Sequence, residues 1–149
     1  MPAFPSLEWF EALRTEVNND PGFRHFGMVD ARVGIKVGDQ AFEVVFEAFD
    51  CESVREVSDA ELGDCDFWLE QPPQAWSEML LNIKQNGSAD ADHTLNTLDL
   101  LLPESLARST DGYKRDLFYR FNQTLQDFFN AASRLETTFR TSPAVAGAS

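Results

Sequence analysis

The sequence predicts an α+β fold in which an antiparallel hairpin and further strands are covered by helices. Apolar and polar residues alternate over 31–37 and 40–49, with Gly38-Asp39 between the two runs, as is typical of a β-hairpin. In the last third of the chain, apolar residues recur at steps of three and four, which is typical of one face of a long helix. This apolar stripe consists of Phe118, Phe121, Leu125, Phe128, Ala132, Leu135 and Phe139.

The first predicted element is a helix from Ser6 to about Asn19. Ser6 is a favourable N-cap, and the apolar residues that follow share one helix face. They are Trp9, Phe10, Leu13 and Val17. The run Asn19-Asp20-Pro21-Gly22 ends the helix because it combines proline with glycine.

The register of the hairpin follows from its turn. A two-residue loop at Gly38-Asp39 pairs Val37 with Gln40, Ile35 with Phe42, Val33 with Val44 and Ala31 with Phe46. Apolar residues then face apolar residues, so this side is expected to be core or the wall of a cavity. The other side carries Lys36 and Arg32 diagonal to Glu43 and Glu47, and we expect it to be solvated or partly covered.

Two more strands and a helix are predicted after the hairpin. Residues 54–57 are a short third strand and residues 65–71 a longer one. Pro72-Pro73 ends the longer strand and starts a helix that Asn86-Gly87 closes. Residues 95–102 fit helical spacing but also suit an edge strand, and we favour a helix followed by a loop.

The helix that carries the apolar stripe is predicted to begin near Asp111, as N-cap, and to end at about Arg140. It is then roughly 28 residues, or ~42 Å, long. Burial of each large side chain is worth ~1.5–3 kcal/mol, against an ordering cost of ~1–2 kcal/mol per residue, so the stripe needs a partner surface. That partner is the chain's own sheet, a second chain or an apolar ligand. Phe at four of the seven positions favours a sheet or a broad groove over a regular coiled coil.

Composition excludes several classes of partner. The 149 residues fit one domain, which we place at 1–140, followed by a disordered tail over 141–149. With 25 acidic and 12 basic residues the net charge is −13, and no basic cluster is available to bind nucleic acid. The start of the chain lacks the pattern of a signal peptide, and no apolar stretch approaches membrane-spanning length. We therefore expect a cytoplasmic protein without stable membrane insertion, in which Cys51 and Cys65 are free and mostly buried.

Signals for chemistry are weak. No nucleophile elbow, phosphate-binding glycine loop or pair of zinc-binding cysteine doublets occurs. Asp90, Asp92 and His93 have the donor atoms for a metal but are more typical of a solvated turn. His25 beside core aromatics is a candidate general base, and Cys65 a candidate nucleophile, yet both residues fit ordinary packing better. No catalytic residue, metal or cofactor is expected.

Residues 6–102 resemble the sterol carrier protein type 2 domain. The resemblance rests on an N-terminal helix, a Gly-Asp hairpin and the strand Asp66-Phe67-Trp68-Leu69 running into Pro73-Gln74-Ala75-Trp76-Ser77-Glu78-Met79-Leu80. It implies a mostly antiparallel sheet of about four to five strands covered by helices, with an apolar tunnel for sterols, fatty acids or acyl-CoA. The chain departs from the family at His93–Leu100, where a Gly-Lys strand and a Gly-Asp turn are usual, and in its longer, Phe-rich C-terminal helix.

The resemblance implies non-catalytic binding or transfer of a hydrophobic ligand in a cavity between sheet and helices. The expected lining is Phe42, Phe46, Phe67, Trp76, Leu80, Phe121, Leu125 and Phe128, although the same residues also suit a tight core. Two alternatives remain open. One is a small enzyme of the nuclear transport factor 2-like kind, in which His25, His93 or Asp66 is essential. The other is an interaction module that forms a homodimer through the apolar stripe.

Overall fold

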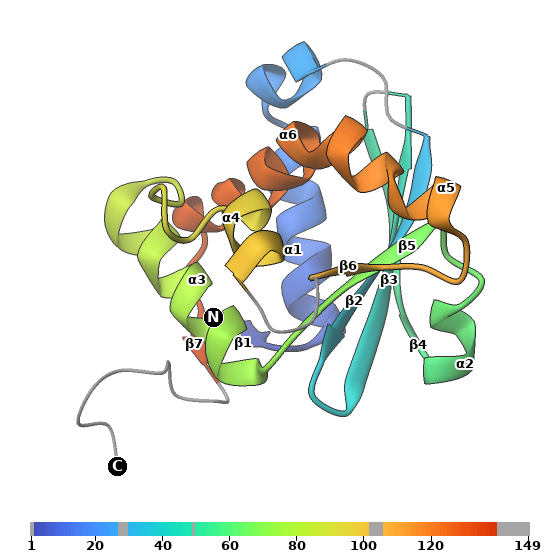
Figure 1. The fold of residues 1–149 in the computed structure, drawn as a ribbon. Coiled ribbons are helices and arrows are strands. Elements are labelled where there is room, and N and C mark those ends of the chain that lie inside the picture. The colour runs from blue at the N-terminus through green and yellow to red at the C-terminus, as the bar shows by residue number, and fades with distance from the viewer. Residues whose placement is uncertain (1, 27–29, 49, 102–105, 140–149) are drawn as a thin grey trace.

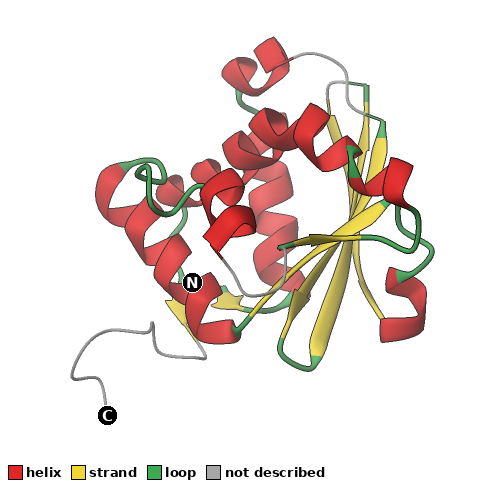
Figure 2. Cartoon of the chain, in the orientation of Figure 1, coloured by secondary structure: helices red, strands yellow, loops and turns green. Residues whose placement is uncertain are grey.

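The computed structural model describes residues 2–26, 30–48, 50–101 and 106–139 (Figure 1). A five-stranded sheet forms one layer, and α1, α3, α4 and α6 gather on one of its faces (Figures 1 and 2). In chain order the elements are β1 (Ala3–Phe4), α1 (Leu7–Asn18), η1 (Pro21–Phe26), β2 (Ala31–Val37), β3 (Gln40–Glu47), β4 (Asp50–Val57), α2 (Asp59–Leu62), β5 (Phe67–Gln71), α3 (Pro73–Asn86), α4 (Leu95–Leu101), β6 (Ala107–Arg108), α5 (Gly112–Arg115), α6 (Leu117–Asn130), η2 (Ala131–Arg134) and β7 (Thr138–Phe139). The predicted α+β class is confirmed.

The two helices with the clearest local signals begin and end where the sequence places them. The Ser6 side chain accepts a hydrogen bond from the backbone N–H of Trp9 and caps α1. Pro73 opens α3, and Gly87, at φ 82°, ends it in the left-handed conformation that glycine tolerates best. The predicted inward faces of both helices are buried.

The hairpin has the predicted register. Ile35 pairs with Phe42, Val33 with Val44, Ala31 with Phe46 and Val37 with Gln40. Gly38 takes φ 60° in the turn, a conformation in which a side chain is strained. A third antiparallel strand, β4, extends the predicted segment 54–57 back to Asp50.

The sheet is mixed rather than mostly antiparallel, which corrects the prediction. Its strand order is β4-β3-β2-β5-β6, and β5 lies parallel to β2, with Val33 opposite Phe67. After β4 the chain passes through α2 and returns beside β2 in the same direction, a crossover that parallel strands require. The alternation of residues 65–71 predicted a strand but carries no information on the direction of its neighbour.

Residues 95–101 form the helix α4, so the helical interpretation of this ambiguous segment is confirmed. The loop expected after it falls largely on residues 102–105, which lie outside the described residues. The final strand of the sheet is the short β6, which pairs antiparallel with β5.

The C-terminal helical segment is confirmed over Gly112–Arg134, but it is shorter than predicted and interrupted. Asp111 caps α5 by accepting a hydrogen bond from the N–H of Tyr113, as expected. The helix is then interrupted at Asp116, which lies between α5 and α6. After Arg134 the backbone of Leu135 is extended. Phe139 lies in β7, which pairs in parallel with β1. There the backbone N–H of Thr138 donates a hydrogen bond to the carbonyl oxygen of Pro2.

One apolar core lies between the helices and the sheet. The stripe residues Phe118, Leu125, Phe128 and Ala132 are buried in it, and Phe121, Leu135 and Phe139 pack at its edge. The partner of the stripe is therefore this chain's own fold, and pairing with a second copy stays a prediction. None of the helices in the described ranges has the length and apolarity that a bilayer crossing requires. Residues 140–149, with the predicted tail, fall outside those ranges.

Candidate functional site

The structure brings the expected ligand-lining residues into one cluster between the sheet and the helices. They come from β3 (Phe42, Phe46), β5 (Phe67), α3 (Trp76, Leu80) and α6 (Phe121, Leu125, Phe128). Phe121 is half-buried at the edge, and each of the others is at most 3% exposed. Strand alternation and helical spacing were sufficient to find them, because both patterns report which face of an element is apolar.

Aromatic rings fill the space between the two layers. Phe46 meets Phe128 edge to face, with ring centroids 5.3 Å apart, and Phe10 of α1 lies 4.7 Å from Phe42. On the other side of α6, the ring of Phe129 lies 5.5 Å from that of Trp76. The sequence reasoning missed Phe129, since it falls outside the apolar stripe; its burial follows from α6 packing against α3 as well as the sheet.

A hollow of about 420 Å³ opens at the surface where β2 begins and β3 ends. Phe46 lines it together with Ala31, Arg32, Asp66 and neighbouring residues. Phe46 thus borders this hollow and also contacts Phe128 in the interior.

Polar contacts attach α6 to the segments on its outer side. The Gln126 side chain accepts a hydrogen bond from the backbone N–H of Leu95 at 2.7 Å and donates one to Asn130. Asn130 also accepts from the N–H of Ala89, in the loop before α4. The inner face of α6, by contrast, meets the sheet through apolar side chains. The helix and this loop are thus linked to each other more specifically than either is to the sheet.

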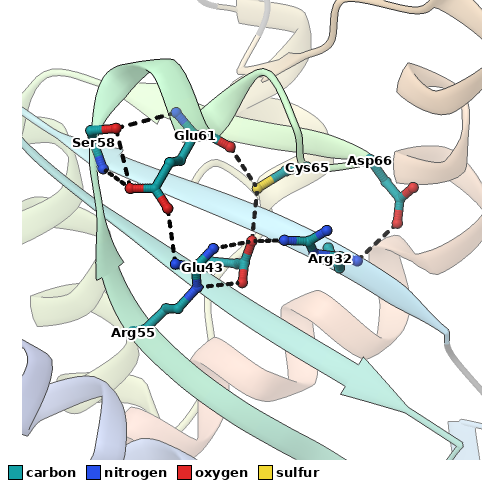
Figure 3. A network of polar contacts seen from close by, with 7 residues as sticks. All are labelled: Arg32, Glu43, Arg55, Ser58, Glu61, Cys65 and Asp66. Atoms are coloured by element: carbon teal, nitrogen blue, oxygen red, sulfur yellow. Dashed lines mark hydrogen bonds and ion pairs between the residues drawn. The ribbon is translucent and has the colours of Figure 1, made fainter.

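The opposite face of the sheet carries a charged network (Figure 3). The carboxylate of Glu43 is 4% exposed and accepts hydrogen bonds from Arg32 at 2.8 Å and Arg55 at 2.9 Å. Burial alone would raise the pKa of Glu43, but the two guanidinium groups outweigh it and lower that pKa. Arg55 also binds Glu61 of α2, which ties this short helix to β4. Arg32 and Glu43 thus lie on the same face of the hairpin, as the predicted register implies.

The second basic residue on this face, Lys36, has a partner outside the hairpin. Lys36 binds Asp59 of α2 at 2.6 Å rather than a hairpin carboxylate, because α2 covers this part of the sheet. A small apolar cluster lies beneath α2, with Ala41, Val57 and Leu62 buried and Trp68 packed against them. The face is partly covered, as the sequence predicted.

Both cysteines are free and buried, which confirms the prediction. Burial raises the pKa of the Cys65 thiol to about 12, and the nearby Glu43 carboxylate contributes. Burial likewise raises the pKa of Cys51 to about 12. At neutral pH both side chains are protonated thiols, which are weak nucleophiles.

The residues considered for acid-base or metal chemistry have separate partners. His93 contacts Asp90 at 2.6 Å and Glu78 at 3.6 Å, whereas the Asp66 carboxylate accepts from the backbone N–H of Arg32. The His25 side chain lies outside what the structure describes. In the described part of the chain, no three His, Cys, Asp or Glu side chains are grouped as a metal site would require.

No protein-family model and no curated protein sequence matches the chain. One solved structure, described as the crystal structure of sterol carrier protein 2, matches with a TM-score of 0.61 at 17% sequence identity. The match covers 88% of this chain and 98% of that chain. The chain is therefore similar in fold to sterol carrier protein 2, as the layout of residues 6–102 indicated.

Proposed function

We propose that this protein binds a hydrophobic ligand non-covalently, between the sheet and the helices α3 and α6. The observation that supports the proposal is the aromatic layer itself, in which Phe46 contacts Phe128 and also borders a surface hollow. Similarity in fold to sterol carrier protein 2 agrees with it. A sterol, a fatty acid or an acyl-CoA are the candidate ligands.

Binding requires the rings to separate, and apolar burial can offset that cost. Each CH₂ group transferred from water contributes about 0.8 kcal/mol, so a chain of about sixteen carbons gains on the order of 12 kcal/mol. The ligand replaces the ring contacts it breaks, since its chain then lies against Phe46 and Phe128. Outward movement of α6 with the loop at Ala89, which Asn130 links, would admit it.

We propose binding rather than catalysis because the two candidate acid-base side chains that the structure describes, Asp66 and His93, have separate partners. Asp66 lies at the edge of the sheet and contacts Arg32 and Ser109 through its side chain and carbonyl. His93 lies between α3 and α4 with Asp90 and Glu78. Neither residue lines the aromatic layer.

The proposal is tested by native mass spectrometry of the purified protein and by displacement of a fluorescent fatty-acid probe. We expect a co-purified or added apolar ligand to appear as a bound mass, and the probe to be displaced by it. Detection of the apo mass alone, together with no probe binding, would contradict the proposal.

A variant pair locates the site. Phe121 is half-buried at the edge of the aromatic layer, so Phe121→Ser removes a lining ring at a modest cost in stability. We expect probe binding to weaken about five- to tenfold, which corresponds to the loss of one ring contact. Leu100 is 72% exposed on α4, and Leu100→Ser is the matched control, with unchanged affinity. Equal affinities of the two variants would place the probe elsewhere.

A further inference from the structure

Among the residues that the structure describes, the buried side-chain amide of Gln71 has no hydrogen-bond partner for either its oxygen or its nitrogen. Gln71 is the last residue of β5 and is 4% exposed. The alternation of the strand directs it to the same side as Phe67 and Leu69, both fully buried. A buried amide normally finds partners, because burying polar groups without them is costly. An inward, unpartnered amide at the end of an apolar strand therefore indicates that a polar group of a bound ligand forms hydrogen bonds with it.

The indole N–H of Trp76, a described polar group near this end of the sheet, is already paired. Trp76, in the first turn of α3, donates its indole N–H to the carbonyl oxygen of Lys36 at 2.9 Å. Lys36 is followed by Val37, the residue opposite Gln71 in the β2–β5 register. The amide of Gln71 is thus left with the apolar core on one side and the surface on the other.

Gln71 also lines a surface hollow of about 280 Å³ between the β2–β3 turn and the start of α3. The other lining residues are Lys36, Gly38, Glu70, Pro72, Pro73 and Arg108. Their charges are largely compensated: Lys36 binds Asp59 at 2.6 Å, and Arg108 binds Glu70 at 3.4 Å. A neutral polar group fits this wall better than an ion.

The chemistry of the amide narrows the group further. The oxygen of Gln71 needs a donor and its nitrogen needs an acceptor. A hydroxyl group supplies both functions through one atom. A carboxylate only accepts, and would leave the amide oxygen unpartnered beside a negative charge.

We propose that Gln71 anchors the hydroxyl group of an amphiphilic ligand, such as a sterol or a long-chain alcohol. This inference rests on the proposed function and adds the head group and the orientation of the ligand. The hydroxyl lies at the β5–α3 end, next to the hollow, and the apolar body extends along β5 past Leu69 and Phe67. Gln71 is then a specificity-determining residue.

The experiment compares matched ligands on the full-length protein by displacement of the fluorescent probe. Tetradecan-1-ol and its methyl ether share one chain, but the ether cannot donate a hydrogen bond. We expect the wild type to bind the alcohol about tenfold more tightly, as one lost hydrogen bond to a buried group predicts. Gln71→Leu should bind the two ligands equally, with its affinity for the ether within about twofold of wild type. Gln85→Leu, the same change at an exposed position of α3, should keep the tenfold preference.

Binding of cholesterol, measured in the same way, shows whether a sterol or a long-chain alcohol supplies the hydroxyl. A Gln71 dependence for cholesterol, for tetradecanol or for both supports the inference and names the ligand. Gln71→Leu should melt at or above the temperature of the wild type, because leucine needs no hydrogen-bond partner.

Three results would contradict the proposal that Gln71 binds the ligand hydroxyl. The first is equal binding of alcohol and ether by the wild type, a test that needs no variant to fold. The second is a preference that persists in Gln71→Leu, as expected if an internal water satisfies the amide. In both cases apolar binding, and with it the proposed function, survives. The third is no binding of any ligand or probe, which overturns the proposed function as well.

Discussion

The ring of Phe46 on β3 meets the ring of Phe128 on α6 edge to face, at an interplanar angle of 85°. This contact joins the central part of the sheet to the C-terminal helix, and both residues are at most 3% exposed. The apolar stripe of the C-terminal third thus finds its partner in the hairpin of the same chain.

Removal of the Phe128 ring should destabilise the protein strongly. We expect Phe128→Ala to lower the free energy of unfolding by about 3–5 kcal/mol, because it leaves a cavity in a close-packed layer. Phe121→Ala, at the half-buried edge, should cost less than half as much. Urea denaturation followed by circular dichroism measures both values. Similar losses for the two variants would argue against a tight core around Phe128.

Gly34 lies where β2 passes beneath α2, and no side chain fits there. A Cβ at this position would lie 2.5 Å from Cδ2 of Leu62 and 2.7 Å from Cβ of Trp68. Gly34→Ala should therefore destabilise the protein by about 1–3 kcal/mol. At Gly112, the first residue of α5, a Cβ meets nothing within 4 Å, so Gly112→Ala should be neutral or stabilising by up to about 1 kcal/mol. Thermal unfolding of both variants tests the difference, which disappears if α2 does not pack on β2.

The buried carboxylate of Glu43 should make stability depend on acid pH. Burial favours the protonated form, but Arg55 and Arg32 prevail and lower the pKa. The stabilisation is complete above the unfolded pKa of about 4.3 and is lost as the pH falls through the lower folded value. Since both arginines are about half exposed and can be solvated, Glu43→Gln should cost only about 1–3 kcal/mol at pH 7.

The difference in melting temperature between wild type and Glu43→Gln should stay constant from neutral pH to about pH 5 and shrink below about pH 4. Glu136, which is 72% exposed, provides the control, and Glu136→Gln should differ little from wild type throughout. A Glu43→Gln deficit that is unchanged at low pH would show that packing, not charge, holds Glu43.

The pKa of His93 should lie above its ordinary value. Partial burial of the ring lowers its pKa, but the hydrogen bonds and charges of Asp90 and Glu78 outweigh burial and raise it. The pairing stabilises the fold below the unfolded pKa of about 6.5 and is lost as the pH rises through the raised value. An NMR titration of the imidazole should show this, and Asp90→Asn should shift the pKa of His93 back down. An unchanged pKa in that variant would contradict the pairing.

Much of the fold could be predicted because its signals act over short distances. The two-residue turn at Gly38-Asp39 sets the register of the hairpin, and side-chain alternation then decides which face is apolar. Ser6, Pro73 and Gly87 define helix ends through the conformation and hydrogen bonds of the neighbouring backbone. The same patterns identified most of the aromatic layer but not Phe129.

The missed features depend on contacts between distant segments. Gln71 shares the alternation of Phe67 and Leu69, so the sequence predicts that its side chain points inward. The sequence does not predict that its amide has no partner among the described residues. Glu43 is buried on the face that α2 covers, and the segment after the C-terminal helix pairs through Phe139 with β1 at the other end of the chain. A one-dimensional pattern does not contain these contacts.

By itself the sequence determined the main helices, the strands β2 to β5, their apolar faces and the hairpin register, because caps, turns and side-chain periodicity are local properties of the backbone. Only the tertiary structure decided the parallel pairing of β5 with β2, the break of the C-terminal helix at Asp116 and the isolation of the Gln71 amide. These depend on which segments the crossover through α2 brings together. Their energies come from hydrogen bonds and packing between residues far apart in the chain, which exist only once the layers have closed.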